Sequence, residues 1–158
     1  MDRKYILTDE TITYDGRTLY RIKAVKDVGV LVKAGELGGF IEGEYNLSHE
    51  GLCWVHDNAT VYGNARVYGN ASINDNAMVY DFAEVFGGAN IYGNAQIFGK
   101  AYVYGDAEIT DDARVYGDAV VCDDARVYGD ADVYGDAYVH CAASLGWGKS
   151  LYGTERFW

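Results

Sequence analysis

The sequence of 158 residues contains no proline and only three cysteines. Without proline, tight corners must be built by Gly, Asn and Asp, which tolerate the backbone angles that such corners require. The cysteines, Cys53, Cys122 and Cys141, are odd in number and irregular in spacing. This pattern argues against a disulfide framework and favours the reducing environment of the cytoplasm.

Long apolar runs are also missing, although hydrophobic residues make up 49% of the chain. A membrane-spanning helix needs roughly 18 or more consecutive apolar residues, and the first residues lack the apolar segment of a secretory signal. We therefore expect a soluble, cytoplasmic protein with no membrane partner. The length favours one domain, with or without a small appendage.

Basic residues are scarce, with 13 Lys and Arg against 24 Asp and Glu and a formal net charge of −11. Residues 106–136 alone contain ten acidic side chains and two arginines, Arg114 and Arg126. Such a surface repels the phosphates of DNA and RNA, so we expect no direct nucleic acid binding. Basic proteins and metal ions are compatible with it.

A repeat of six residues dominates the chain after residue 54. From Val55 to Leu151 every sixth residue is aliphatic, and an alanine stands four residues after each of these from Ala59 to Ala143. An α-helix cannot use a period of six, because 3.6 residues per turn would spread the aliphatic residues around its surface. Each hexad therefore predicts one short strand and one Gly-Asn or Gly-Asp corner. Hexads must stack to bury their apolar sides, as in a solenoid.

Residues 55–154 resemble the hexapeptide-repeat superfamily, in which a small residue follows an aliphatic one after four positions. The resemblance implies a left-handed parallel β-helix with three hexads in each triangular coil. Seventeen hexads then predict five to six coils, and the fold class is all-β. The superfamily usually forms trimers, which implies a homotrimer here.

The segments on either side of the repeat predict two caps. Residues 1–54 are expected to form a small N-terminal β cap with a hairpin around Asp15-Gly16. Elements such as Ala34-Gly35 and Gly38-Gly39 resemble the leader of YdcK-like proteins, which phages and prophages often carry. Residues 55–146 form the predicted β-helix, and 147–158 a C-terminal cap that protects the open end.

Positions that are three hexads apart should stack, and one such column is almost purely aromatic: Tyr62, Tyr80, Phe98, Tyr116, Tyr134 and Tyr152. These rings could simply stiffen the sheet, each pair contributing roughly 0.2–1 kcal/mol. We favour the alternative, in which a long aromatic strip outside the core is an oligomer or partner surface.

The corner residues change from Asn in the first half of the repeat to Asp in the second, at Asp106, Asp112, Asp118, Asp124, Asp130 and Asp136. Corner geometry and solubility are the simpler account of these aspartates. They do not explain the change, since stacked carboxylates repel each other and Asn would avoid that cost. A functional account is a rod of negative charge that imitates nucleic acid. A divalent cation site ranks lower, because calcium needs six to eight converging oxygens.

The sequence favours a protein that is not an enzyme and needs no cofactor. Acyltransferases of the superfamily bind acyl-coenzyme A between subunits and use a histidine, often near a loop that interrupts the coils. Here no loop interrupts the repeat, and His56 and His140 are separated by more than four coils, or roughly 20 Å. Three histidines spaced as in the gamma-type carbonic anhydrases of the same fold are also missing.

One small cluster is a weak candidate for metal binding. Cys122 and His140 lie three hexads apart in one column, with Cys141 next to them. Two cysteines and one histidine fall one ligand short of a structural zinc site. The simpler interpretation is that Cys122 and His140 replace aromatic residues in a tolerant column, so we predict no metal.

These observations predict a non-enzymatic binding or scaffold protein, associated with a phage and located in the host cytoplasm. Its acidic surface would engage a basic host protein, such as a nucleic-acid-binding or defence protein, and could inhibit it by imitating nucleic acid. Two alternatives are open: an acyltransferase-like protein that uses acyl-coenzyme A, and a structural component of the virion.

Overall fold

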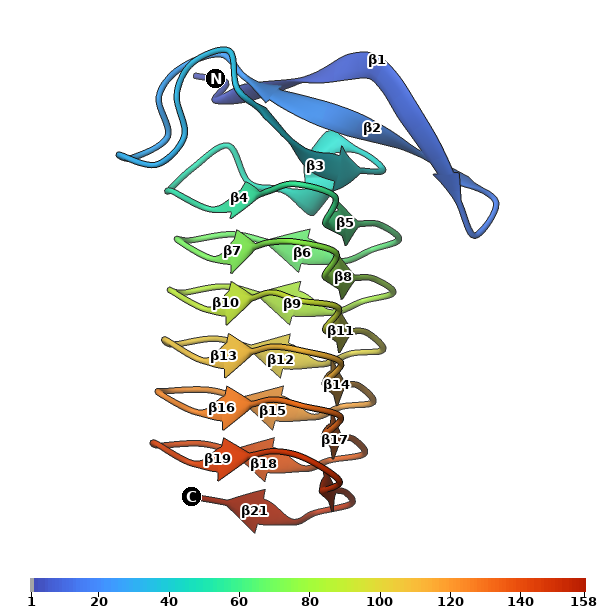
Figure 1. Cartoon of the computed structure of the whole chain (residues 1–158), viewed down its shortest axis with the longest axis vertical. Helices are drawn as coiled ribbons and strands as arrows, with labels where there is room; N and C mark the ends of the chain where they lie inside the picture. The colour runs from blue at the N-terminus through green and yellow to red at the C-terminus, as the bar shows by residue number, and fades with distance from the viewer. Residues whose placement is uncertain (1) are drawn as a thin grey trace.

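A computed structural model describes residues 2–158 as a column of short strands below an N-terminal hairpin (Figure 1). The hairpin consists of β1 (Tyr5–Tyr14) and β2 (Arg17–Ala24), and the leader continues through β3 (Leu37–Ile41) and the 3-10 helix η1 (Glu44–Asn46). The repeat then forms strands of two residues each: β4 (Trp54–Val55), β5 (Thr60–Val61), β6 (Arg66–Val67), β7 (Ser72–Ile73), β8 (Met78–Val79), β9 (Glu84–Val85), β10 (Asn90–Ile91), β11 (Gln96–Ile97), β12 (Tyr102–Val103), β13 (Glu108–Ile109), β14 (Arg114–Val115), β15 (Val120–Val121), β16 (Arg126–Val127), β17 (Asp132–Val133), β18 (Tyr138–Val139), β19 (Ser144–Leu145), β20 (Ser150–Leu151) and β21 (Arg156–Phe157).

Within residues 2–158 the strands form three sheets, one for each face of a prism. Every third strand pairs in parallel with the next, so Val55 lies beside Ile73 and Val61 beside Val79. Each face carries six strands of the repeat, and one face continues through β3 into the hairpin. The expected all-β parallel solenoid is confirmed. Its eighteen short strands β4 to β21 make six complete coils, at the upper end of the predicted five to six, and β3 begins one further turn above them.

The interior is made of the two repeated apolar positions. Every aliphatic residue of the repeat from Val55 to Leu151, and every alanine from Ala59 to Ala143, is buried. In a single coil the inward apolar side chains would be open to water above and below, so the core forms only when coils stack. The large number of alanines keeps the prism narrow, because three faces meet around the same axis.

The corners use a left-handed backbone, with a positive φ at the second residue after each inward aliphatic one from Val55 to Val139. Most of these residues are glycines, and the others are chiefly aspartates such as Asp75 and Asp111. The Asp75 Oδ2 atom accepts a hydrogen bond from the backbone N–H of Gly93 at 2.9 Å, and Asp111 does the same for Gly129 at 2.9 Å. These corner aspartates therefore connect one coil to the next and offset the backbone cost of their conformation.

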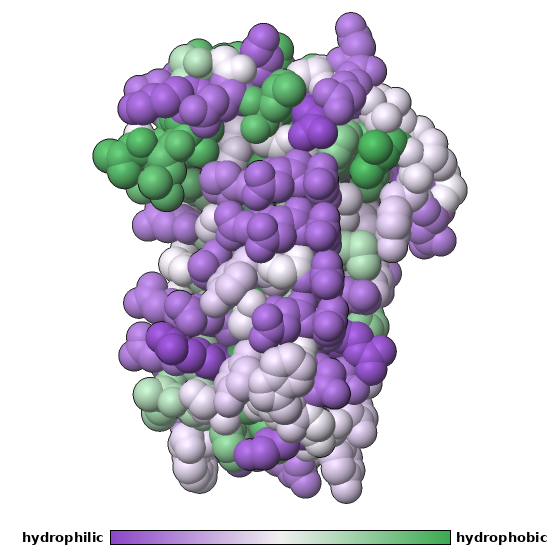
Figure 2. Space-filling view, in the orientation of Figure 1, coloured by the Kyte–Doolittle hydropathy of each residue, from purple (hydrophilic) through white to green (hydrophobic). Residues whose placement is uncertain are grey.

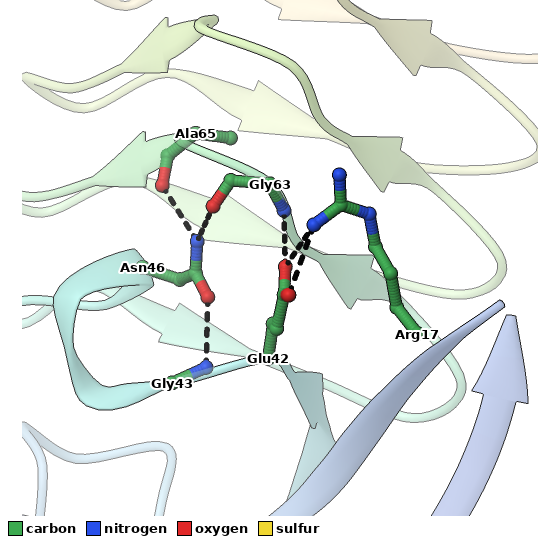
Figure 3. Close-up of polar contacts among 6 residues, drawn as sticks. All are labelled: Arg17, Glu42, Gly43, Asn46, Gly63 and Ala65. Atoms are coloured by element: carbon green, nitrogen blue, oxygen red, sulfur yellow. Dashed lines mark hydrogen bonds and ion pairs between the residues drawn. The ribbon is translucent and has the colours of Figure 1, made fainter. Parts of the chain in front are cut away.

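The leader closes the N-terminal end of the prism by satisfying the backbone of the first coil (Figure 3). The buried amide of Asn46 donates to the carbonyls of Gly63 at 3.2 Å and Ala65 at 2.9 Å. The Glu42 carboxylate accepts the N–H of Gly63 at 2.7 Å and is held by Arg17 at 2.9 Å. The first coil is thus not an open strand edge, which would invite pairing with another chain.

A buried lysine ties the start of β1 to the end of the leader. The Lys4 ammonium donates to the backbone carbonyls of Glu50, Gly51 and Cys53 at 3.3, 3.4 and 2.8 Å. It also contacts the Cys53 Sγ atom at 3.1 Å. Burial lowers the pKa of Lys4 and raises the pKa of Cys53, while their mutual attraction opposes both shifts.

At the opposite end, the coils continue through residues 147–158. Strands β20 and β21 pair with β17 and β18 in the register of the earlier coils. Lys149 and Glu155 stand where earlier coils have alanine, and both are exposed. Residues 147–158 therefore continue the solenoid rather than form a separate element. Across residues 2–158, no helix is long and apolar enough to span a membrane.

Candidate functional site

The aromatic column forms one continuous stack along an edge of the prism. Neighbouring rings are nearly parallel, and their centroids are 4.7–5.7 Å apart along the series Tyr62, Tyr80, Phe98, Tyr116, Tyr134 and Tyr152. Tyr62 is buried and packs against Tyr14 of the hairpin at 5.5 Å, whereas Tyr152 is 55% exposed. The rings between them are half-buried. Each ring covers the face of the next, so the ladder offers a partner mainly ring edges and hydroxyl groups below the hairpin.

A second stack lies on another edge and ends in sulfur and imidazole. Tyr68, Phe86 and Tyr104 stack at centroid distances of 4.8 and 4.9 Å. Below them the column continues with Cys122 and His140. Cys122 is buried, and its Sγ atom lies 3.4 Å from the hydroxyl of Tyr138. Its thiol therefore faces the neighbouring strand.

The six predicted partner-binding aspartates are all exposed, and they lie in pairs on the three edges of the prism. Positions that are three hexads apart share an edge, as the strand register shows. One edge therefore carries Asp112 and Asp130, another Asp118 and Asp136, and the third Asp106 and Asp124. The carboxylates form an acidic belt around the lower half of the solenoid. We use "acidic belt" for these six residues below.

The two arginines of this region are already occupied by other acids. Arg114 makes two hydrogen bonds to Asp132 at 2.7 and 2.8 Å, and Arg126 lies 3.3 Å from Glu108. Within residues 2–158 no ion pair includes a member of the acidic belt. Asp112 instead accepts a hydrogen bond from the side chain of Asn94 at 3.0 Å. Among the described residues, the belt's negative charge is therefore not neutralised by an ion pair.

The structure groups His140 and Cys141 with Asp123. One ligand atom from each of the three lies within 4.8 Å of the others, and the His140 Nδ1 atom is 3.2 Å from the Cys141 Sγ atom. Cys122, the third member of the set considered from sequence, is not in this group. Asp123 was missed because only cysteine and histidine were considered, although it stands one coil before Cys141 on the same corner.

An apolar patch at the N-terminal end also escaped the sequence analysis, because it lies outside the repeat. Figure 2 shows hydrophobic side chains gathered on the loop that precedes β3. Val30 is 85% exposed and Leu31 82% exposed, and Leu52 is 54% exposed nearby. Leu31 and Leu52 both border a shallow cavity of about 200 Å³.

Residues 59–74 match the family model described as YdcK Beta solenoid repeat. The matched stretch covers part of the first two coils and supports a repeat β-solenoid, in agreement with the stacked strands. A search of curated proteins found no match.

Proposed function

We propose that this protein is a non-enzymatic binding or scaffold protein whose acidic belt engages a basic surface on a partner protein. The observation that carries the proposal is the fixed array of six exposed carboxylates without cationic partners in the described chain. The continuous core and the stacked aromatic ladder hold these charges at a constant spacing. A rigid charge array loses little conformational entropy on binding, which favours affinity.

The density of charge supports imitation of a nucleic acid. Residues 106–136 carry ten acidic and two basic side chains, and they span less than two coils, or roughly 10 Å at about 4.8 Å per coil. Duplex DNA carries roughly one negative charge per 1.7 Å of its axis. A basic surface that binds DNA phosphates would therefore find a comparable density of negative charge on residues 106–136. The resemblance of the leader to YdcK-like phage and prophage proteins favours a host protein in the cytoplasm as the partner.

The proposal includes self-association into a homotrimer through the aromatic ladder. The rings from Tyr80 to Tyr134 are half-buried, and Tyr152 is exposed in the single chain. Aromatic residues are enriched at protein interfaces. Sedimentation equilibrium tests this part, and a monomer at micromolar concentration would contradict it.

A pull-down from host lysate tests the acidic belt. We expect bound proteins to be basic and to be released by raised salt, since exposed charges are screened within about 10 Å at 0.1 M ionic strength. A variant with Asp118, Asp124, Asp130 and Asp136 changed to Asn should lose them. Retention of the same proteins by this variant would refute the proposal.

A control variant separates the belt from net charge in general. Asp9→Asn, Asp15→Asn, Glu36→Gln and Glu50→Gln remove four exposed carboxylates from the hairpin and leader, as many as the belt variant removes, and this variant should keep the partner. Thermal shift with acetyl-coenzyme A tests the non-enzymatic part. A clear rise in melting temperature would favour an acyltransferase, because a ligand that binds only the folded state stabilises it.

A further inference from the structure

We propose that Asp123, His140 and Cys141 bind one divalent transition-metal ion of the zinc class, independently of the acidic belt. Asp123 follows β15, and His140 and Cys141 follow β18 in the next coil. Parallel pairing of β15 with β18 therefore brings the three side chains to one corner. They supply one carboxylate oxygen, one imidazole nitrogen and one sulfur.

The distances are close to those of ligands that share an ion. The three ligand atoms lie within 4.8 Å of one another, and the Nδ1 and Sγ atoms are 3.2 Å apart. Two ligands on a tetrahedral zinc ion are roughly 3.5 Å apart, given about 2.3 Å for Zn–S and about 2.0 Å for Zn–N. Rotation of the exposed Cys141 side chain can close the remaining difference.

Neighbouring groups already orient the ligands. The Asp123 Oδ2 atom accepts the backbone N–H of Cys141 at 3.0 Å, which holds the carboxylate against the corner that Cys141 forms in the next coil. The His140 ring makes edge contacts with Tyr138 at 5.0 Å and with Trp158 at 4.8 Å. Hydrogen bonds to ligating groups such as the Asp123 carboxylate hold metal ligands in position, and the two ring contacts limit the rotation of the imidazole.

Position 141 carries a cysteine where the other left-handed corners of the repeat carry glycine or aspartate. Cys141 has a φ of 57°, in the left-handed region where the other residues of its column are Gly69, Gly87, Gly105 and Asp123. An aspartate recovers the cost of this backbone through its bond to the next coil. Cys141 is exposed, and its Sγ atom lies beside the His140 ring. Its thiol can therefore serve as a ligand that faces solvent.

The donor set selects the class of metal. Sulfur and imidazole suit zinc and related transition metals, whereas calcium and magnesium prefer oxygen ligands. Three protein ligands leave a fourth position for water or for a group from another molecule.

Titration of the reduced, metal-free protein with Co²⁺ tests the site. We expect one equivalent to bind with a thiolate-to-cobalt charge-transfer absorption, Zn²⁺ to abolish that absorption, and excess Mg²⁺ to leave it unchanged. Absence of the charge-transfer band, or its loss with Mg²⁺, would overturn the proposal.

Variants can use residues that the same columns contain in other coils, so folding is preserved. Cys141→Gly and Asp123→Gly copy the glycines above them, and His140→Phe copies Phe86. Cys141→Gly should abolish the absorption, and the other two should weaken cobalt binding at least tenfold. Cys122→Ala is the matched control and should bind as the unchanged protein does. If Cys122→Ala abolished the absorption, or if Cys141→Gly kept it, the assigned ligands would be wrong.

Discussion

Replacement of Gly105 by alanine should destabilise the solenoid by blocking the close approach of two coils. Gly105 has a φ of 71°, and a Cβ atom there would lie 2.6 Å from the backbone nitrogen of Asp123 and 2.9 Å from its Cα atom. Both contacts are with backbone, so no side-chain rotation relieves them. The coils themselves would have to separate.

The expected change in the free energy of unfolding combines two destabilising effects and one stabilising effect. A left-handed backbone costs alanine roughly 1–2 kcal/mol, and overpacking typically adds about 1–3 kcal/mol. The reduced freedom of the unfolded chain returns about 0.4–1 kcal/mol. We expect Gly105→Ala to lower the free energy of unfolding by about 2–4 kcal/mol. This is a large fraction of the roughly 5–15 kcal/mol that is typical of folded proteins.

Two other glycines separate the steric cost from the backbone cost. Gly63 has a φ of 65°, and its added Cβ would lie 3.1 Å from the nearest backbone atom of Asp81. Gly148 has a φ of 66°, and nothing lies within 4 Å of its added Cβ. Urea denaturation followed by far-ultraviolet circular dichroism should rank the alanine variants at positions 105, 63 and 148 from most to least destabilised, at similar m values. Equal destabilisation at positions 105 and 148 would refute the argument from coil spacing.

Three further changes test other contacts. Lys4→Met leaves the carbonyls of Glu50, Gly51 and Cys53 without their donor, and it should cost about 1–3 kcal/mol. Amide hydrogen exchange in residues 44–55 should become faster; unchanged exchange would contradict the role of Lys4 in tying β1 to the leader. Burial lowers the pKa of His56, so the unfolded chain takes up a proton before the folded one, and stability should fall as the pH drops below about 6.5. His56→Gln should reduce that slope in urea titrations at several pH values, and an identical slope would contradict the assignment. Asp111→Ala loses the bond from Gly129 and should cost about 1–3 kcal/mol, whereas Asp111→Gly should recover part of it; equal urea midpoints would refute this role.

The sequence was most informative where the chain repeats. The spacing of Val61, Val79 and Ile97 predicted which strands pair, and Tyr116 and Tyr134 stack as positions one coil apart should. The acidic belt was visible as a change of residue type at the corners. Its division among three edges follows from the same period, because successive hexads occupy successive faces.

The leader was much less predictable, since it has no period that relates its contacts. Nothing in the sequence indicates that the Lys4 ammonium donates to the carbonyl of Cys53, or that the Asn46 amide donates to the carbonyl of Gly63 in the first coil. These contacts depend on the path of β1 to β3 over the first coil. The sequence also did not distinguish two structural roles of aspartate. Asp111 has a left-handed backbone and bonds to the next coil, whereas the neighbouring Asp112 belongs to the acidic belt, and both positions carry the same residue type.

By itself, the sequence determined the solenoid, its inward residues and its stacked columns, because only short strands that recur with every third hexad can bury an aliphatic residue at every sixth position. The tertiary structure alone decided which side chains close the N-terminal end, and how near the ligand atoms of Asp123, His140 and Cys141 come to one another. Those arrangements depend on the direction in which individual side chains leave the backbone, and a repeat specifies neighbouring positions without specifying that direction.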